Sequence, residues 1–184
     1  MLLLLFEKII IIIDEDIKNN LKIINASDYA QFFAPEINDQ NDQDPEFNEK
    51  RRIGENDSEI CEIIRRDSVP DFTKYIGNTN ISLSSSTKSS IYETNSFLLN
   101  KNIKLIEYAA FFGSVQIFKY LIENKVELTS SIWPYATHGA KIDIIELIKK
   151  EKINPDNNDF SKIYKKAIKF HQNSFADNIY ENLM

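Results

Sequence analysis

Glycine, cysteine and histidine are scarce in this sequence, and each scarcity excludes a kind of site. The 184 residues include four glycines, and no GxGxxG or GxxxxGK pattern is present, so we expect no phosphate-binding glycine loop. The single cysteine, Cys61, cannot form a disulfide within the chain, and the fold therefore needs no oxidising compartment. Two histidines and one cysteine show no ligand spacing such as CxxC or HxxxH, so we expect neither a metal nor a cofactor.

Basic residues are in the minority. The chain has 22 Lys and Arg against 28 Asp and Glu, a formal net charge of −6 with a sequence pI near 5.1. Nucleic-acid-binding domains usually carry a basic surface, and no basic run interleaved with aromatic residues is present, so we expect no nucleic-acid partner. Hydrophobic residues make up 42% of the chain and charged residues 27%, which is the balance of a folded globular protein.

The first 13 residues are almost wholly apolar, interrupted only by Glu7 and Lys8. A transmembrane helix needs about 20 apolar residues, and a signal peptide has a basic start and small residues at its cleavage site. We therefore predict an N-terminal helical segment over residues 1–34 whose apolar part is buried. The five isoleucines of residues 9–13 leave a strand open because β-branched residues favour strands. A targeting segment or membrane contact is the remaining alternative.

Two stretches are polar and irregular. Residues 35–52 are acidic and amide-rich, which predicts a solvated linker. An EF-hand does not fit this stretch, because no glycine stands at the sharp turn that would follow Asp42, Asp44 and Glu46. Residues 77–102, with six serines between positions 82 and 90, are predicted to be an inserted loop.

A repeated apolar pattern fills most of residues 53–184. Its anchors are Asp67, Gly113, Gly139 and Phe170. Isoleucines stand seven residues before and nine residues after each anchor, at positions 60, 106, 132 and 163 and at positions 76, 122, 148 and 179. Further apolar residues at spacings of three and four complete one face of two short helices around each anchor. We predict helix pairs at about 58–76, 104–122, 130–148 and 161–182, which stack because one pair alone buries too little apolar surface.

The unit LIEYAAFFGSVQIFKYLI, residues 105–122, resembles the ankyrin repeat. Ile106, the alanine pair 109–110, Gly113 and the paired apolar residues of the second helix fall where that pattern puts them. More specifically, IGENDSEICEIIRRDSV (53–69), SIYETNSFLLN and LIEYAAFFGSVQIFKYL are similar to the large ankyrin-repeat-like family of trichomonad protists. This resemblance covers about residues 53–184. It implies an all-α, ankyrin-like α-solenoid of stacked helix pairs that binds proteins, and it brings no catalytic residues.

The spacing of the anchors departs from the ankyrin pattern. The anchors at positions 67, 113, 139 and 170 lie 46, 26 and 31 residues apart, whereas ankyrin units repeat about every 33 residues. The shortest spacing leaves only residues 123–131 between two helix pairs, too few for a full projecting β-hairpin finger. We therefore expect binding through the concave face of the helices.

The residues just before the anchors are the candidates for partner binding, because they face the groove in an ankyrin-like stack. The candidate set is Arg65, Arg66, Phe111, Phe112, Thr137 and His138, with Trp133 one turn earlier on its helix. Aromatic residues and arginine are the usual anchors of protein interfaces, and this set suits an apolar or acidic partner segment. The alternative is that the 77–102 insertion or the N-terminal helix packs over these aromatic side chains.

Catalysis is not expected. Cys61 with His138 or His171 is the one nucleophile–base combination to consider, but Cys61 lies mid-helix among isoleucines, where a lone cysteine is usually inert. The sequence favours a cytoplasmic, non-enzymatic interaction module or adaptor for an unknown protein partner. A membrane-peripheral protein held by its apolar N-terminus is the alternative from a different class. A decaying member of its gene family without a selected role is the third interpretation.

Overall fold

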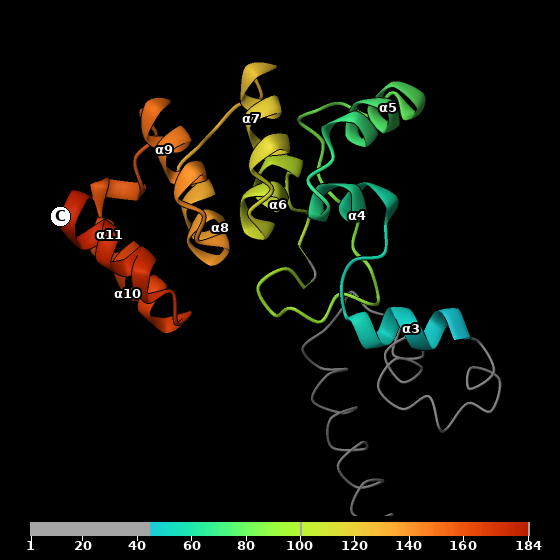
Figure 1. The fold of residues 1–184 in the computed structure, drawn as a ribbon, viewed down its shortest axis with the longest axis horizontal. Coiled ribbons are helices and arrows are strands. Elements are labelled where there is room, and N and C mark those ends of the chain that lie inside the picture. The colour runs from blue at the N-terminus through green and yellow to red at the C-terminus, as the bar shows by residue number, and fades with distance from the viewer. Residues whose placement is uncertain (1–44, 100, 184) are drawn as a thin grey trace, which may run out of the picture. The chain divides into compact units, whose positions relative to one another are not determined.

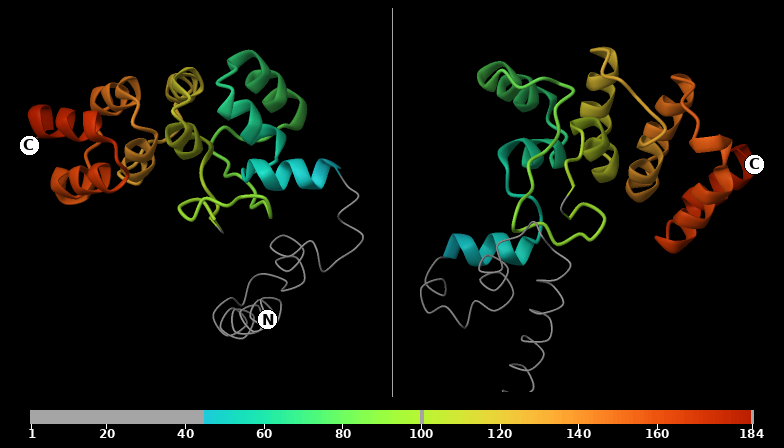
Figure 2. Two further views of the ribbon diagram at one scale, coloured as in Figure 1. Left: turned by 60° about the horizontal axis from the view of Figure 1, so that its bottom comes forward. Right: turned by 180° about the vertical axis from the view of Figure 1, so that it is seen from behind.

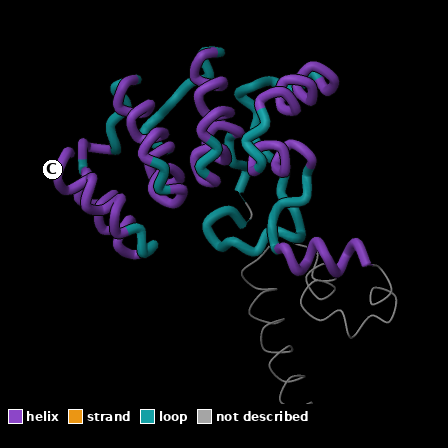
Figure 3. The backbone as a smooth tube through the Cα atoms, viewed as in Figure 1, coloured by secondary structure: helices purple, strands orange, loops and turns teal. Residues whose placement is uncertain are grey.

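The computed structural model describes residues 45–99 and 101–183, whose regular secondary structure is helical (Figures 1 and 3). Within these residues a single isolated β-bridge joins Ser86 to Lys104, and no strand forms. The predicted all-α class is therefore confirmed for this part of the chain. The helical segment predicted over residues 1–34, and with it the choice between helix, strand and membrane contact at residues 1–13, lies outside the described residues.

The described residues form nine α-helices and one short 3-10 helix, Asp156–Asn158. The α-helices are α3 (Pro45–Ile53), α4 (Glu59–Arg65), α5 (Val69–Thr79), α6 (Leu105–Phe112), α7 (Val115–Glu123), α8 (Ile132–Gly139), α9 (Ile142–Lys150), α10 (Phe160–Lys169) and α11 (Asn173–Leu183). They divide between two compact units, described residues 45–56 with 90–97, and described residues 57–89 with 98–183. None of the helices over residues 45–99 and 101–183 has the length and apolar character needed to cross a membrane.

The first unit is built on α3, where the composition predicts part of a linker. That prediction is wrong for residues 45–52. Glu46 in the first turn and basic residues in the last turn complement the helix dipole, and Lys50 pairs with Glu46 at 2.9 Å. Phe47 is buried and meets Tyr92 edge-on, with ring centroids 5.7 Å apart. This contact comes from a distant part of the chain, so local composition does not reveal it.

The second unit arranges its helices in two rows. Helices α4, α6, α8 and α10 pack side by side in chain order, and α5, α7 and α9 pack in a second row (Figures 1 and 2). Tight turns connect the rows, and α4 with α5, α6 with α7, and α10 with α11 form packed pairs. The helix bounds lie within three residues of those expected from the apolar pattern. The core runs between the rows and consists mainly of isoleucine, leucine, alanine and phenylalanine.

A residue in the left-handed conformation lies in the turn inside each helix pair. These residues are Asp67 (φ 52°), Gly113 (φ 71°), Ala140 (φ 48°) and His171 (φ 58°). The sequence pattern places the last two turns one residue earlier, at Gly139 and Phe170, and that register is wrong. Gly139 is instead the last residue of α8, where an added Cβ would lie 2.2 Å from the Ala110 carbonyl oxygen. It is glycine because α6 and α8 approach closely there.

With the register corrected, α6–α7 and α8–α9 occupy equivalent positions in the sequence. Both helices of the later pair begin and end 27 residues after those of the earlier pair. The left-handed residues that follow the second helices, Lys125 and Lys152, are also 27 residues apart. The predicted spacing of 26 residues is therefore 27, from position 113 to position 140, while the following spacing stays at 31.

The turn of the first pair contributes a cap to the second pair. The Asp67 carboxylate accepts hydrogen bonds from the N–H groups of Gln116 and Ile117 at 3.0 and 2.9 Å. Ser114, which precedes α7, donates its hydroxyl to the Ile64 carbonyl oxygen at 2.6 Å and does not cap the helix itself. Asp67 thus satisfies N–H groups that have no partner within α7, and neighbouring pairs are tied together by polar contacts as well as by the core.

Ala140 adopts a backbone conformation that alanine disfavours, at a cost of about 1 kcal/mol or slightly more. We expect Ala140→Gly to raise the free energy of unfolding by about 0.5–1 kcal/mol, because relief of strain exceeds the added entropy of the unfolded chain. Urea unfolding followed by circular dichroism measures this change. The same substitution at Ala136, inside α8, should lower stability by about 1 kcal/mol. Equal losses at both positions would contradict the left-handed turn at Ala140.

Candidate partner-binding surface

The carboxyl ends of the first-row helices bring aromatic and basic side chains into one line. The Phe111 ring of α6 stacks on the His138 ring of α8 with centroids 3.9 Å apart, and His138 lies 5.1 Å from Phe170 after α10. In the other direction Phe112 meets Phe111 at 5.0 Å, and the Arg65 guanidinium of α4 lies 5.7 Å from the Phe112 ring centroid. These five residues lie at the carboxyl ends of α4, α6 and α8 and just after α10, and we call them the aromatic row.

Arg65 is held in place by a second contact. Its Nη1 donates a hydrogen bond to the Tyr108 hydroxyl at 2.7 Å, and the Tyr108 ring packs on Phe112 with centroids 4.7 Å apart. Burial raises the pKa of Tyr108 well above its usual range, and nearby Cys61 raises it further. The phenol therefore stays protonated and accepts the bond from Arg65 as a neutral group. The guanidinium is thus oriented before any partner arrives.

His138 lies between two aromatic rings at the centre of the aromatic row. Desolvation by burial lowers the pKa of its imidazole below 6.5, so the ring is neutral at pH 7. Its backbone carbonyl accepts a hydrogen bond from the Gln172 side chain at 3.3 Å. The imidazole ring stacks on Phe111 and lies near the Phe170 ring. His138 as a whole is half-buried.

The lowered pKa of His138 predicts a pH dependence of stability. The unfolded chain protonates this imidazole near pH 6.5, whereas the folded chain takes up the proton only at lower pH. Unfolding is therefore favoured increasingly as the pH falls below about 6.5. We expect the free energy of unfolding to decrease between pH 7.5 and pH 5.5, and to decrease less in His138→Phe, which keeps the stack. Urea titrations of both proteins test this, and identical pH profiles would contradict it.

The seven residues predicted from the sequence to bind a partner separate into two groups. Phe111, Trp133 and Thr137 are buried, with 5%, 1% and 0% of their surface exposed. Arg65, Phe112 and His138 are half-buried, and Arg66 is exposed. The structure therefore leaves the second group accessible, and the buried Phe111 ring contacts two of its members, Phe112 and His138.

Trp133 and Thr137 have contacts that belong to the core. The Trp133 indole N–H donates to the Ile153 carbonyl oxygen at 3.1 Å, and its ring meets Phe160 edge-on at 5.4 Å. The Thr137 hydroxyl donates to the Trp133 carbonyl oxygen at 2.7 Å. These partners of the indole come from the chain after α9, a different source from the two covering segments considered from the sequence.

Two residues of this surface were missed by reasoning from the sequence. The sequence pattern makes Phe170 an anchor, although the corrected register makes it equivalent to Phe112, immediately before the left-handed residue. Tyr108, which orients Arg65, precedes the alanine pair and has no groove signature of its own. A signal was present, because Tyr108 and Tyr135 stand 27 residues apart, the spacing that corrects the register.

Two further kinds of site, a reactive cysteine and a metal centre, can be considered in the described residues. Cys61 is fully buried in α4, out of reach of a substrate. Among residues 45–99 and 101–183 no group of three or more His, Cys, Asp or Glu side chains is arranged to hold a metal ion. Neither observation adds a catalytic centre to the surface described above.

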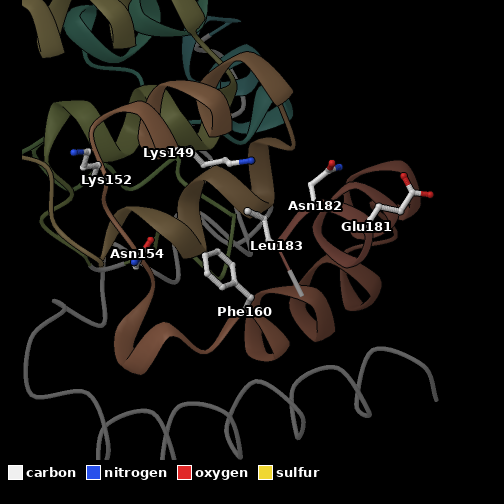
Figure 4. A pocket seen from close by; sticks show the side chains of 7 residues that line it. All are labelled: Lys149, Lys152, Asn154, Phe160, Glu181, Asn182 and Leu183. Carbon is white, nitrogen blue, oxygen red and sulfur yellow. The ribbon is translucent and has the colours of Figure 1, made fainter.

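A shallow pocket of about 680 Å³ lies at the far end of the second unit, where α9, α10 and α11 converge (Figure 4). Its lining consists of Lys149, Lys152, Asn154, Phe160, Glu181, Asn182 and Leu183. Both signs of charge are present, and the lysines, Asn154 and Glu181 are exposed to solvent. The lining therefore favours no single class of ligand.

Comparison of the chain with protein-family models, with curated proteins and with solved structures found no match. The functional interpretation consequently rests on this chain's own residues.

Proposed function

We propose that this chain is a non-enzymatic interaction module of ankyrin-like stacked helix pairs, and that its aromatic row binds an acidic, apolar segment of another protein. The observation that carries the proposal is the continuous line from Arg65 to Phe170, in which four rings lie against one another and the Arg65 guanidinium lies over the first of them, that of Phe112. No cofactor is required. Cys61, the single cysteine of the chain, is fully buried and needs no disulfide partner, which is compatible with a reducing compartment and with the cytoplasmic location that we propose.

The repeat interpretation is supported by equivalent burial in successive pairs. Across the 27-residue spacing, buried residues match buried residues in both helices: 106 with 133, 109 with 136, 110 with 137, 117 with 144, 118 with 145, and 121 with 148. Counted from His171, the last pair buries Ala167, Phe175, Ala176 and Ile179 at the corresponding places. Repeats that bury a shared core only by stacking behave in this way. The short connection between α7 and α8, which contains no strand, favours a helical surface over projecting fingers for binding.

The two positions that precede each left-handed residue indicate the sign of charge on the partner. Reading along the stack, these positions hold Arg65 and Arg66, Phe111 and Phe112, His138 and Gly139, and Lys169 and Phe170. Basic and aromatic side chains are therefore present and no acidic side chain is. In a chain of net charge −6, such a line is where an acidic segment is attracted rather than repelled.

The side chains of the aromatic row are already ordered, which lowers the entropic cost of binding a partner. Aromatic and arginine side chains supply most of the energy at protein interfaces, and the cost of binding falls when they are already ordered. Arg65 is ordered by Tyr108 and Phe112, and His138 by the rings on either side of it. A segment that sets one carboxylate against Arg65 and another beside His138, with an apolar side chain on Phe112, would use both features.

The test is selection from a random peptide library displayed on phage, with the full chain as bait. We expect the recovered peptides to be enriched in Asp and Glu next to large apolar residues. The best peptide should bind Phe112→Ala and Arg66→Glu at least about tenfold more weakly. The first change removes an aromatic anchor, and the second reverses the charge of the exposed arginine that follows Arg65. Fluorescence anisotropy measures these dissociation constants.

A matched control is Lys119→Glu on α7, which makes the same change of charge at an exposed lysine outside the aromatic row. Its affinity for the peptide should stay within about twofold of the parent, because screening weakens the influence of distant surface charges. Recovery of basic peptides, or equal weakening by Arg66→Glu and Lys119→Glu, would contradict the proposed surface.

A further inference from the structure

Each of the three second-row helices begins with an apolar residue that the core does not fully cover. Val69, Val115 and Ile142 are the first residues of α5, α7 and α9. Val69 and Val115 are half-buried, and Ile142 is 47% exposed. Each stands two residues after the left-handed residue of its pair, so the three occupy equivalent places along the stack. We call these three residues the apolar line.

The apolar line and the aromatic row lie at the same end of the stack. A short turn joins the carboxyl end of each first-row helix to the start of its second-row helix (Figure 1). The aromatic row occupies the residues just before these turns. The Cα–Cβ bonds of a helix tilt toward its N-terminus, so the side chains of the apolar line lean toward the turns from the other side.

Neighbouring turns contact one another, which makes the surface between the two lines continuous. The Asp67 carboxylate reaches across to the N–H groups of Gln116 and Ile117 at the start of α7. Lys141, which precedes α9, lays its side chain against Gly113, where an added Cβ would lie 2.6 Å from the Lys141 Cγ. Each of these turns therefore reaches the start of the second-row helix in the next pair.

Charge is distributed unevenly around the two lines. Arg66 and Lys141 are exposed basic residues next to the turns. The Asp67 carboxylate accepts hydrogen bonds from two N–H groups, and the exposed Asp143 directly follows Ile142. An acidic side chain of a partner is therefore favoured toward the aromatic row and disfavoured beside Ile142.

We infer, on the basis of the proposed function, that the bound segment is an amphipathic α-helix of the partner protein. Its apolar face lies across the aromatic row and the apolar line, and its acidic flank lies toward the aromatic row. Contact with Phe112 on one line and with Val115 and Ile142 on the other gives the surface the width that a helix needs, and apolar anchors three, four and seven residues apart are the usual pattern of a helix bound in a groove.

The spacing of the helix pairs favours a helix over an extended segment. Helices α7 and α9 pack on each other, and packed helices lie about 8–10 Å apart, so Val115 and Ile142 recur at about that distance. Residues seven apart in an α-helix lie about 10.5 Å apart on nearly the same face. In a strand, residues about 10 Å apart are three positions apart and point to opposite faces. Residues 45–99 and 101–183 also form no strand whose edge an extended segment could join.

Fluorescence anisotropy of the labelled library peptide with the full chain tests the contact with the apolar line. Ile142→Ser should raise the dissociation constant at least about fivefold, because it removes an apolar contact without adding charge. Tyr180→Ser is the matched control, since Tyr180 is also an exposed apolar side chain, 64% accessible, and lies toward the carboxyl end of α11, away from the turns. It should leave the dissociation constant unchanged within about twofold.

Proline substitution in the peptide tests its helical form. Proline at the centre of the peptide should weaken binding at least about tenfold, because it breaks a helix, whereas proline at the first residue should be tolerated. The 13Cα chemical shifts of the bound, labelled peptide should be helical. An extended bound peptide, or equal effects of Ile142→Ser and Tyr180→Ser, would overturn the inference and leave the proposed function standing if Phe112→Ala still weakens binding. A peptide that Phe112→Ala does not weaken would contradict the proposed function and the inference together.

Discussion

Trp133→Ala is expected to lower the free energy of unfolding by about 4 kcal/mol, a large part of the stability of a typical domain. The Trp133 side chain is 1% exposed, and its indole N–H donates to the Ile153 carbonyl oxygen. Alanine would leave a cavity between α8 and α10 and would remove the only side-chain partner that the structure gives this carbonyl in the described residues. Urea unfolding followed by far-ultraviolet circular dichroism measures the loss.

Trp133→Phe is the matched control for this prediction. Phenylalanine retains the edge contact with Phe160 but loses the hydrogen bond and part of the volume, so we expect a loss of about 1–2 kcal/mol. A loss of less than about 1 kcal/mol for Trp133→Ala would mean that the side chain is not buried as described, and would return it to the set of partner-binding candidates.

Gly139→Ala should lower the free energy of unfolding by about 3 kcal/mol, because the added methyl group has no room. The new Cβ would lie 2.2 Å from the Ala110 carbonyl oxygen and 2.9 Å from that of Phe111. Both atoms belong to the backbone of α6, so only a movement of α8 away from α6 can relieve the overlap. The thermal midpoint of Gly139→Ala, read against the parent, gives a second measure of the same loss.

Gly77→Ala provides the control for the effect of adding a methyl group. Gly77 lies inside α5, and an added Cβ there would meet nothing within 4 Å. Since alanine favours the helix, we expect Gly77→Ala to be neutral or to stabilise the protein by up to about 1 kcal/mol. A Gly139→Ala protein as stable as Gly77→Ala would contradict the close approach of α6 and α8.

The helices were predictable from the sequence because their apolar residues recur at spacings of three and four. The register of the turns was predictable only in part. Glycine signals either a left-handed turn or a close approach of two backbones, and sequence alone does not distinguish Gly113, which is the first case, from Gly139, which is the second. The 27-residue spacing of Tyr108 and Tyr135 favours the correct register. One matching pair of residues is too little to decide the register from sequence alone.

Burial at the candidate surface was not predictable for a different reason. Trp133 and Phe112 belong to the same kind of short aromatic-containing helix, yet Trp133 is covered by Phe160 while Phe112 remains half-exposed. The cover depends on how one helix pair packs on the next, a relation between distant parts of the chain. The same limitation explains α3, which belongs to a polar stretch that resembles a linker although Phe47 packs against Tyr92.

The most direct test of binding by the aromatic row is the pKa of His138 with and without an acidic peptide from the library. Replacing His171 with asparagine, which also tolerates a left-handed backbone, leaves His138 as the one histidine of the chain, so that a single imidazole signal can be followed by nuclear magnetic resonance. A carboxylate held beside this ring favours its protonated form. The pKa of His138 should therefore rise on saturation with the peptide, and binding should tighten as the pH falls through the pKa of the complex. A saturated complex in which the pKa of His138 is unchanged would contradict the proposed site.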